Sequence, residues 1–355
     1  MRSLSRFLAD AEQRIGLLER CRPTNARAEI ERVSEEWERG REASPAFVYG
    51  APRDLAHVRR GLESAACAAT CALEGELLAG RAEELLVEVE LALSVGTARV
   101  RDLAPARFPL PRDGWAAAAL ADAERFVALA EDPPGRTVLA EDRSDPESLV
   151  SILSELVGSR KLALRVETTP ELSSSAATGT GFVRIREGVR HGPAAARRIA
   201  LHEVVAHAEP RLAALREPSG VFVAGTRGSS ADEEGRAILV EERAALLDSS
   251  RKRELGARHL AALAVRDGAE FVDVGRLLVE RGIPARRAVA IAARVLRGGG
   301  LAREVVYLPA WHRVRAALEE DPSLEAWLAR GRLSIDAARA LRVAAAQENV
   351  ATTGV

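Results

Sequence analysis

The sequence is poor in several residue types, and each shortage excludes a class of protein. Three cysteines in 355 residues cannot all pair within one chain, which argues against a disulfide framework and favours a reducing compartment. The net charge is only −1, which argues against a nucleic-acid partner, because such binding needs many uncompensated basic residues. No apolar run approaches the length of a membrane span, and charged residues interrupt the N-terminus where a signal peptide needs its apolar stretch. We therefore expect a cytoplasmic protein with no membrane attachment.

What is present is typical of a globular protein. Hydrophobic residues make up 47% and charged residues 29%, in a chain long enough for one large or two medium domains. The first part has the pattern of amphipathic helices, and residues 131–135 and 142–146 are rich in proline, glycine and aspartate. We place a junction there, which predicts an N-terminal helical region over residues 1–140 and a second region over residues 141–355.

Two segments of the second region alternate apolar and polar residues with a period of two. These are residues 162–168 and 182–186, and a loop rich in serine, threonine and glycine separates them. Such alternation indicates half-buried strands. The sequence as a whole therefore predicts an α+β fold that is predominantly helical, with a small antiparallel sheet.

Histidine is scarce, with six residues in the chain, yet two of them stand in the segment His202-Glu203-Val204-Val205-Ala206-His207. This H-E-x-x-x-H segment lies in an apolar helical run that starts at Pro193, and it resembles a zinc-peptidase signature. The common H-E-x-x-H motif places its histidines four residues apart on one helix face, so a spacing of five requires local widening. Pro210 offers a cause, because it cannot donate a hydrogen bond to the carbonyl of Ala206.

The residue types suit a hydrolytic metal site. Two neutral imidazoles leave Zn²⁺ with its charge and with open positions, and Glu203 can take a proton from water as general base. The glycine and third histidine of the metzincin pattern do not follow His207. A downstream carboxylate is the other usual third ligand, and the next predicted helix offers four candidates: Glu233, Glu234, Glu241 and Glu242.

Three segments together resemble the tyrosine/glutamate carboxypeptidase family of metallopeptidases, which includes the microtubule-associated tyrosine carboxypeptidases. They are the H-E-x-x-x-H segment, Glu233-Glu234-Gly235-Arg236-Ala237, and residues 299–308, and they occur in the family's order and approximate spacing. Weaker similarity occurs at residues 44–49 and 108–111, so the resemblance covers most of the chain. It implies a gluzincin-type zinc metallopeptidase core, preceded by the N-terminal helical region.

The resemblance also implies roles for single residues. Glu234 takes the position of the third zinc ligand beside His202 and His207, and Glu241 that of an acid that orients a ligand histidine. Arg303 stands where the family has a lysine, and Tyr307 where it has a tyrosine. A carboxypeptidase needs such groups to bind the terminal carboxylate and to stabilise an oxyanion. The strand at residues 182–186 resembles the edge strand that aligns the substrate backbone in gluzincins.

Several positions depart from the family pattern, and we expect them near the substrate. Val205-Ala206 replaces Gly-Thr, Glu233 replaces Gln, Arg236 replaces Leu, and residues 302–304 replace Thr-Lys-Asp. The resemblance predicts a zinc-dependent carboxypeptidase that removes a C-terminal residue from a peptide or protein tail. The alternatives are an endopeptidase or aminopeptidase with the same zinc site, a peptide-binding module that has lost activity, and a helical interaction protein in which the motif is coincidental.

Overall fold

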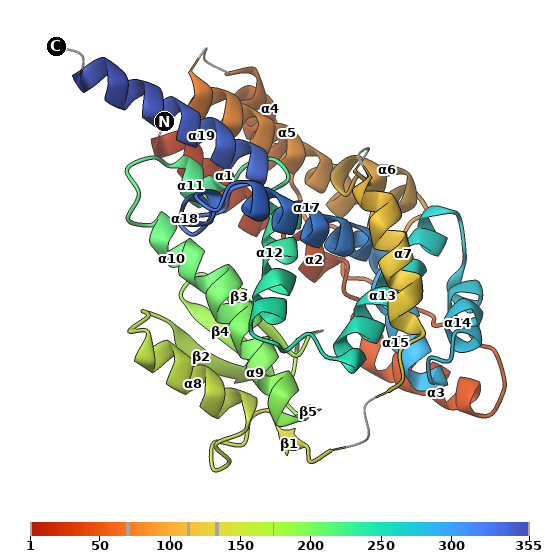
Figure 1. Ribbon diagram of the computed structural model, residues 1–355. Coiled ribbons are helices and arrows are strands. Elements are labelled where there is room, and N and C mark those ends of the chain that lie inside the picture. The colour runs from red at the N-terminus through yellow and green to blue at the C-terminus, as the bar shows by residue number, and fades with distance from the viewer. Residues whose placement is uncertain (1, 69–71, 112–113, 132–134, 173, 354–355) are drawn as a thin grey trace.

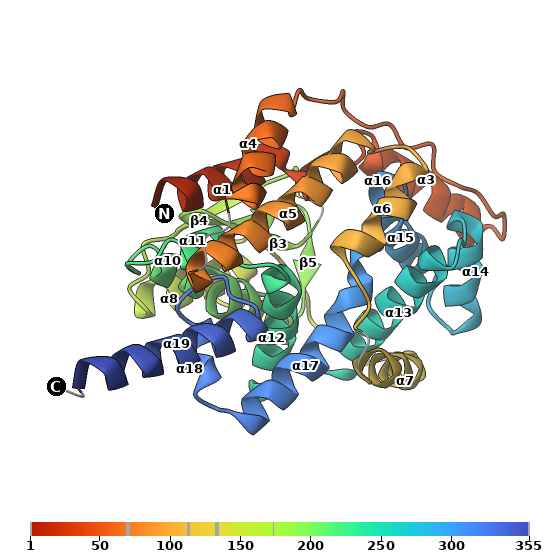
Figure 2. The same ribbon diagram turned by 90° about the horizontal axis from the view of Figure 1, so that it is seen from above.

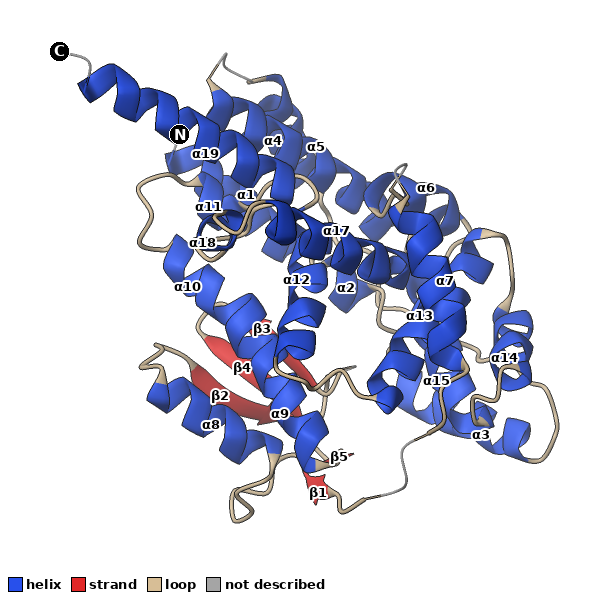
Figure 3. Ribbon diagram, in the orientation of Figure 1, coloured by secondary structure: helices blue, strands red, loops and turns tan. Residues whose placement is uncertain are grey.

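The computed structural model describes residues 2–68, 72–111, 114–131, 135–172 and 174–353. Helices dominate these ranges, and the strands are gathered at one end of the molecule (Figure 3). The predicted α+β, predominantly helical fold is therefore confirmed. None of the helices within the described ranges is long and apolar enough to cross a membrane.

The N-terminal part is helical, as the sequence predicts. Apolar residues at helical spacing explain the packing of the first helix, in which Leu8, Ala11 and Ile15 are buried. Asn25 caps no helix with its side chain; its amide instead bonds the backbone of Ala46 and Val48 and holds the extended connector that follows. The helices are α1 (Arg2–Ile15), α2 (Leu17–Arg20), α3 (Ala26–Glu38), α4 (Ala56–Cys67), α5 (Leu73–Leu93), α6 (Arg99–Arg107) and α7 (Trp115–Val127).

The strands follow the junction and form two small sheets. β4 lies in the centre of the three-stranded sheet, in the order β2-β4-β3; it runs antiparallel to β3 and parallel to β2. β1 and β5 form a separate antiparallel pair. The expected antiparallel pairing is thus present, and β2 adds a parallel pair to it. The elements are β1 (Val138–Leu139), α8 (Leu149–Ser159), β2 (Arg165–Thr169), β3 (Ala176–Gly179), β4 (Phe182–Arg186) and β5 (Arg190–His191).

A continuous helical segment passes beside the three-stranded sheet (Figure 1). It consists of α9 (Pro193–Leu201), the π-helix η1 (His202–Ala208) and α10 (Glu209–Ala214). Proline is well suited to the first position of α9, since its missing N–H would have no partner within the helix there. The chain then forms α11 (Val221–Ala224) and α12 (Ser229–Arg243), and α12 contacts both η1 and α17.

The remaining elements complete the helical body. Figure 2 shows α17 crossing the molecule beside α12, and α19 extending away from the body toward the C-terminus. The elements are α13 (Ser249–Arg266), α14 (Phe271–Glu280), α15 (Ala285–Val295), α16 (Arg297–Gly300), the 3-10 helix η2 (Arg303–Val306), α17 (Tyr307–Glu320), α18 (Leu324–Leu328) and α19 (Ile335–Thr353).

Two clusters of buried apolar residues support this arrangement. The larger cluster joins the N-terminal helices to helices from α10 onward, and the smaller one lies among α8, the three-stranded sheet and α9. The smaller cluster begins with Ala140 and ends with Val204 in η1. The boundary that we expect near residue 140 stays a prediction.

A turn of three glycines brings the chain to η2. Gly298, Gly299 and Gly300 all have positive φ angles, of 74°, 108° and 117°, which side chains rarely tolerate. A Cβ atom on Gly299 would lie 2.6 Å from the carbonyl oxygen of Thr97. The Gly298 N–H also donates to the hydroxyl of Tyr49 over 3.0 Å. The connector after α3 thus helps to hold the turn that precedes Arg303.

Candidate metal centre

The π-helix resolves the five-residue spacing of the two histidines. In η1 the N–H of Glu209 bonds to the carbonyl of Val204, five residues earlier, where an α-helix would bond four residues earlier. In such a widened turn, residues five apart lie nearly above one another. The Nε2 atoms of His202 and His207 are accordingly only 3.3 Å apart. The local widening that the sequence requires is therefore confirmed.

Pro210 lies just after this widened turn, as predicted. It has no N–H for the carbonyl of Ala206, four residues earlier. The guanidinium of Arg236 replaces the missing donor, because its Nη2 donates to the carbonyl oxygen of Ala206. Its Nη1 donates to the carbonyl of Leu328 over 2.7 Å. A side chain of α12 thus replaces a helix hydrogen bond that the sequence of α10 removes.

One of the four candidate acids on α12 lies with the two histidines. Glu234 Oε2 is 3.8 Å from His202 Nε2. One donor atom from each of His202, His207 and Glu234 lies within 4.8 Å of the other two. Glu242 faces elsewhere and accepts a hydrogen bond of 3.0 Å from the indole of Trp311.

The other two acids stand behind the histidines. Glu241 Oε1 is 2.8 Å from Nδ1 of His202, so a proton on Nδ1 donated to this carboxylate leaves Nε2 with a free lone pair. Arg251 in turn donates to Glu241 over 2.8 Å. Glu233 Oε2 lies 3.8 Å from Nδ1 of His207. The acid that the resemblance assigns to orienting a histidine therefore has the required contact.

The charges around the histidines favour a cation. Burial lowers the pKa of His202, but the hydrogen bond and charge of Glu241 outweigh burial and raise the pKa above its usual value. Burial would raise the pKa of Glu234, yet the positive charge of Arg303 dominates and holds that pKa at about 2. Arg251 likewise holds the pKa of Glu241 at about 2 against its burial. The carboxylates are therefore ionised at neutral pH and attract positive charge to the imidazoles.

Glu203 is held by a residue that the sequence analysis did not identify. The hydroxyl of Thr178 donates to Glu203 Oε2 over 2.7 Å, and the carbonyl of Thr178 accepts a bond of 2.7 Å from Arg211. Thr178 lies in β3, within the segment that we expected to be a loop. Its four residues, Ala-Ala-Thr-Gly, are too short and too small to give a strand pattern.

The same strand corrects our prediction about the substrate-aligning strand. β4, at residues 182–186, is the central strand of its sheet and pairs on both sides. The edge strand beside η1 is β3. The prediction that residues 182–186 form the edge strand was wrong, because strand order depends on β3, which the sequence pattern did not reveal.

Arg303 and Tyr307 both lie next to the metal-binding group. Arg303 Nη2 donates to Glu234 Oε1 over 2.7 Å, and its guanidinium carbon lies 5.4 Å from the centre of the Tyr307 ring. Tyr307 begins α17, and its side chain is buried. Burial raises the pKa of its hydroxyl, which keeps the phenol protonated. The structure thus brings all six predicted site residues into one region.

Comparison with known families matches residues 37–354 to the family described as microtubule-associated tyrosine carboxypeptidase. The chain belongs to this family. No curated protein and no solved structure matches the chain.

For this member of the family, the donor set can be tested against zinc. Tetrahedral Zn²⁺ with Zn–N distances of about 2.0–2.1 Å separates two ligand nitrogens by roughly 3.3 Å. The Nε2 atoms of His202 and His207 have that separation, at 3.3 Å. Glu234 Oε2 lies 3.8 Å from His202 Nε2, somewhat wider than this separation. Two imidazoles with one carboxylate form a common catalytic zinc set. The residues present therefore fit a zinc ion.

Proposed function

We propose that this protein is a zinc-dependent carboxypeptidase, which removes a C-terminal residue from a peptide or protein tail. The observation that carries the proposal is the convergence of His202, His207 and Glu234, with Glu203 held one residue along from the first histidine. Membership of the carboxypeptidase family supports the reaction type. The family's name makes a C-terminal tyrosine the first substrate to test.

The three converging residues would hold the zinc ion. When bound there, zinc would lower the pKa of a water molecule and polarise the scissile carbonyl. Glu241 keeps the imidazole of His202 oriented through the 2.8 Å hydrogen bond, and Glu233 places a negative charge 3.8 Å from Nδ1 of His207 without a hydrogen bond. Arg303 fixes the second oxygen of Glu234, which leaves the first oxygen turned toward His202.

Glu203 performs the proton transfers in this proposal. It accepts a proton from the water that attacks the scissile carbonyl, and it delivers that proton to the amine as the C–N bond breaks. Thr178 holds the carboxylate in place through the 2.7 Å hydrogen bond. The buried phenol of Tyr307 is a protonated donor for the developing oxyanion, and the remaining N–H groups of Arg303 are suited to the terminal carboxylate of the substrate.

The first test is the zinc content of the purified protein, measured beside Glu234→Ala and Glu203→Gln. We expect about one zinc per chain in the wild type and in Glu203→Gln, and a sharp loss in Glu234→Ala. Hydrolysis of peptides ending in tyrosine should disappear in Glu203→Gln, which retains the metal. Turnover by zinc-loaded Glu203→Gln would refute the mechanism.

The same peptides with amidated C-termini test the specificity. A carboxypeptidase should lose activity on amidation, because the carboxylate that it recognises is gone. Equal cleavage of free and amidated peptides would identify an endopeptidase or aminopeptidase. A well-folded wild type that binds no zinc even when zinc is supplied would instead leave a peptide-binding module.

A further inference from the structure

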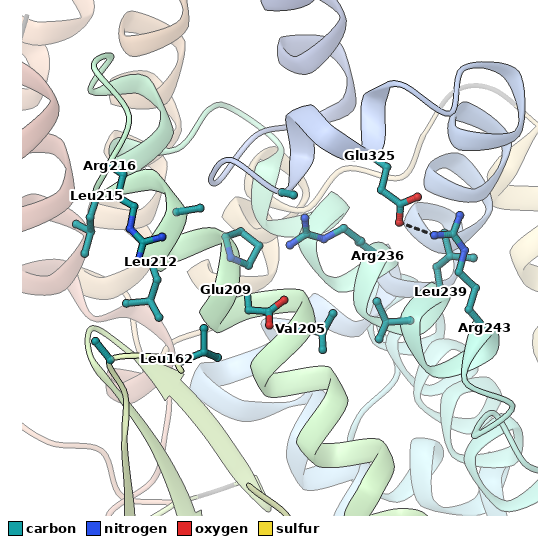
Figure 4. A pocket seen from close by; sticks show the side chains of 15 residues that line it. Leu162, Val205, Glu209, Leu212, Leu215, Arg216, Arg236, Leu239, Arg243 and Glu325 are labelled. Atoms are coloured by element: carbon teal, nitrogen blue, oxygen red, sulfur yellow. Dashed lines mark hydrogen bonds and ion pairs between the residues drawn. The ribbon is translucent and has the colours of Figure 1, made fainter. Parts of the chain in front are cut away.

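A cavity of about 480 Å³ lies between α10, α12 and the segment that precedes β2 (Figure 4). Val205 of η1 and Leu212 of α10 line one side, and Leu239 of α12 lines another. Figure 4 shows the side chain of Arg236 reaching from α12 into the space between these helices. The volume lies within the range of small-molecule sites, roughly 300–1,000 Å³.

This cavity is separate from the candidate metal centre, although both use the same helices. Glu234 and Glu241 are seven residues apart and therefore share one face of α12. Arg236 and Leu239 are three residues apart and lie on the opposite face, which lines the cavity. Val205 and Arg236, which we expect near the substrate, both line the cavity behind the metal-binding face, and that expectation stays a prediction.

Most of the lining is aliphatic, and the acids at the cavity already have partners. Glu209 pairs with Arg160 over 2.6 Å, and Glu325 pairs with Arg243 over 2.5 Å. The aliphatic lining includes Leu162, Val205, Pro210, Leu212, Leu239 and Val240. An apolar tail of a ligand could be accommodated against these side chains without burying an unpaired polar group.

Arg216 and Arg236 line the cavity without an ion pair in the described part of the chain, and the second of them reaches into the space between the helices (Figure 4). Arg236 donates to the carbonyl oxygens of Ala206 and Leu328, but it forms no ion pair with any carboxylate in the described part of the chain. A guanidinium has five N–H donors, so the two carbonyls leave donors for another acceptor. The carboxylates of Glu233, Glu325 and Glu209 act on this charge, but none lies close enough to form an ion pair, so a bound carboxylate would be the first in direct contact with the guanidinium.

We propose that this cavity binds a small monocarboxylate with an apolar tail, of the medium-chain fatty-acid type, whose carboxylate pairs with Arg236. The aliphatic walls take the tail. The planar guanidinium fork matches a carboxylate better than it matches a neutral hydroxyl. The site does not depend on the proposed peptidase activity, and its test needs neither zinc nor substrate.

The test is isothermal titration of the full chain with three probes that share one tail: octanoate, octanol and octylamine. Octanoate should bind about tenfold or more tightly than octanol, because only the carboxylate gains charge-assisted hydrogen bonds from Arg236. Octylamine should bind most weakly, since its charge repels the guanidinium. Equal affinity for octanoate and octanol, or no saturable binding of octanoate, would overturn the proposal.

Three variants locate the site. Arg236→Gln should weaken octanoate binding about tenfold or more, while Arg243→Gln serves as the matched control, because Arg243 lines the same cavity but already pairs with Glu325. Ala329→Trp should block binding while leaving every hydrogen bond of Arg236 in place, since Ala329 is exposed and lines the cavity. This variant keeps the test decisive if Arg236→Gln fails to fold. Octanoate affinity unchanged in Ala329→Trp would place the ligand elsewhere and refute the assignment.

Discussion

Gly235 lies where α12 touches α17, and replacing it should separate the two helices. A Cβ atom added at this position would lie 2.4 Å from the carbonyl carbon and 2.5 Å from the carbonyl oxygen of Ala310. Both atoms belong to the backbone of α17, so no side-chain rotation can relieve the contact. Gly235 also follows Glu234 directly, which means that any displacement of α12 moves a proposed zinc ligand.

The size of the effect follows from these distances. Ordinary contacts of a Cβ atom start at 3.4 Å, so α17 must retreat by about 1 Å. Overpacking of a buried site costs about 1–3 kcal/mol, while alanine gains at most about 1 kcal/mol over glycine inside a helix. Gly235→Ala should therefore lower the free energy of unfolding by up to about 2 kcal/mol, measured by urea denaturation at neutral pH.

The matched control is Gly80→Ala, which makes the same substitution inside α5. There the nearest atom to the new Cβ is the Cβ of Arg227, at 3.9 Å, so the methyl group meets no obstacle. This variant should raise the free energy of unfolding by about 0.5–1 kcal/mol. The two substitutions are thus expected to have opposite signs. A Gly235→Ala protein at least as stable as the wild type would show that α12 and α17 do not approach as closely as described.

Three further outcomes test the site and the core. Thr178→Val should lower kcat about tenfold or more with zinc content unchanged, because the general base loses a charge-assisted hydrogen bond; Thr168→Val on β2 is the control, and equal kcat values in the two would refute this role. Glu241→Gln should weaken zinc binding roughly 10- to 100-fold in a chelator competition, since His202 loses its carboxylate partner; unchanged affinity would contradict this. Burial lowers the pKa of His259 to about 4, below its value in the unfolded chain. As the pH falls from 6.5 toward 4, this histidine takes up a proton in the unfolded chain but not in the folded protein, so the free energy of unfolding decreases. The decrease amounts to up to about 3 kcal/mol. The free energy of unfolding of His259→Leu, measured in urea at the two pH values, should not show this decrease. An identical pH dependence in the variant would show that another group is responsible.

Much of the local structure was accessible from the sequence because it depends on short-range rules. The spacing of five between His202 and His207, with Pro210 beyond them, predicted a widened turn, and η1 is a π-helix. Period-two alternation predicted β4 with the bounds that the structure has. It also predicted β2, which starts three residues later in the structure than the alternation indicated. These features follow from hydrogen bonds and side-chain periodicity within a few residues.

Strand order was not accessible in this way. β3 is four residues long, contains small side chains and gave no alternation that could be recognised. Its position at the sheet edge decides that Thr178 meets Glu203, a partner 25 residues away in sequence. Hydrogen bonds over such separations depend on how the sheet packs against η1. That packing cannot be predicted from the residue pattern within one short segment.

The sequence by itself determined which functional groups are available. These are two histidines at a spacing that requires a π-turn, the glutamate that follows the first of them, and four acids on the following helix. Only the tertiary structure decided which of these acids contacts which histidine. The rotation of α12 against η1 brings Glu234 to the histidines' Nε2 side and Glu241 behind His202, while Glu242 turns to Trp311. That rotation is set by side-chain packing between helices, including the close approach at Gly235, and therefore by residues far apart in the chain.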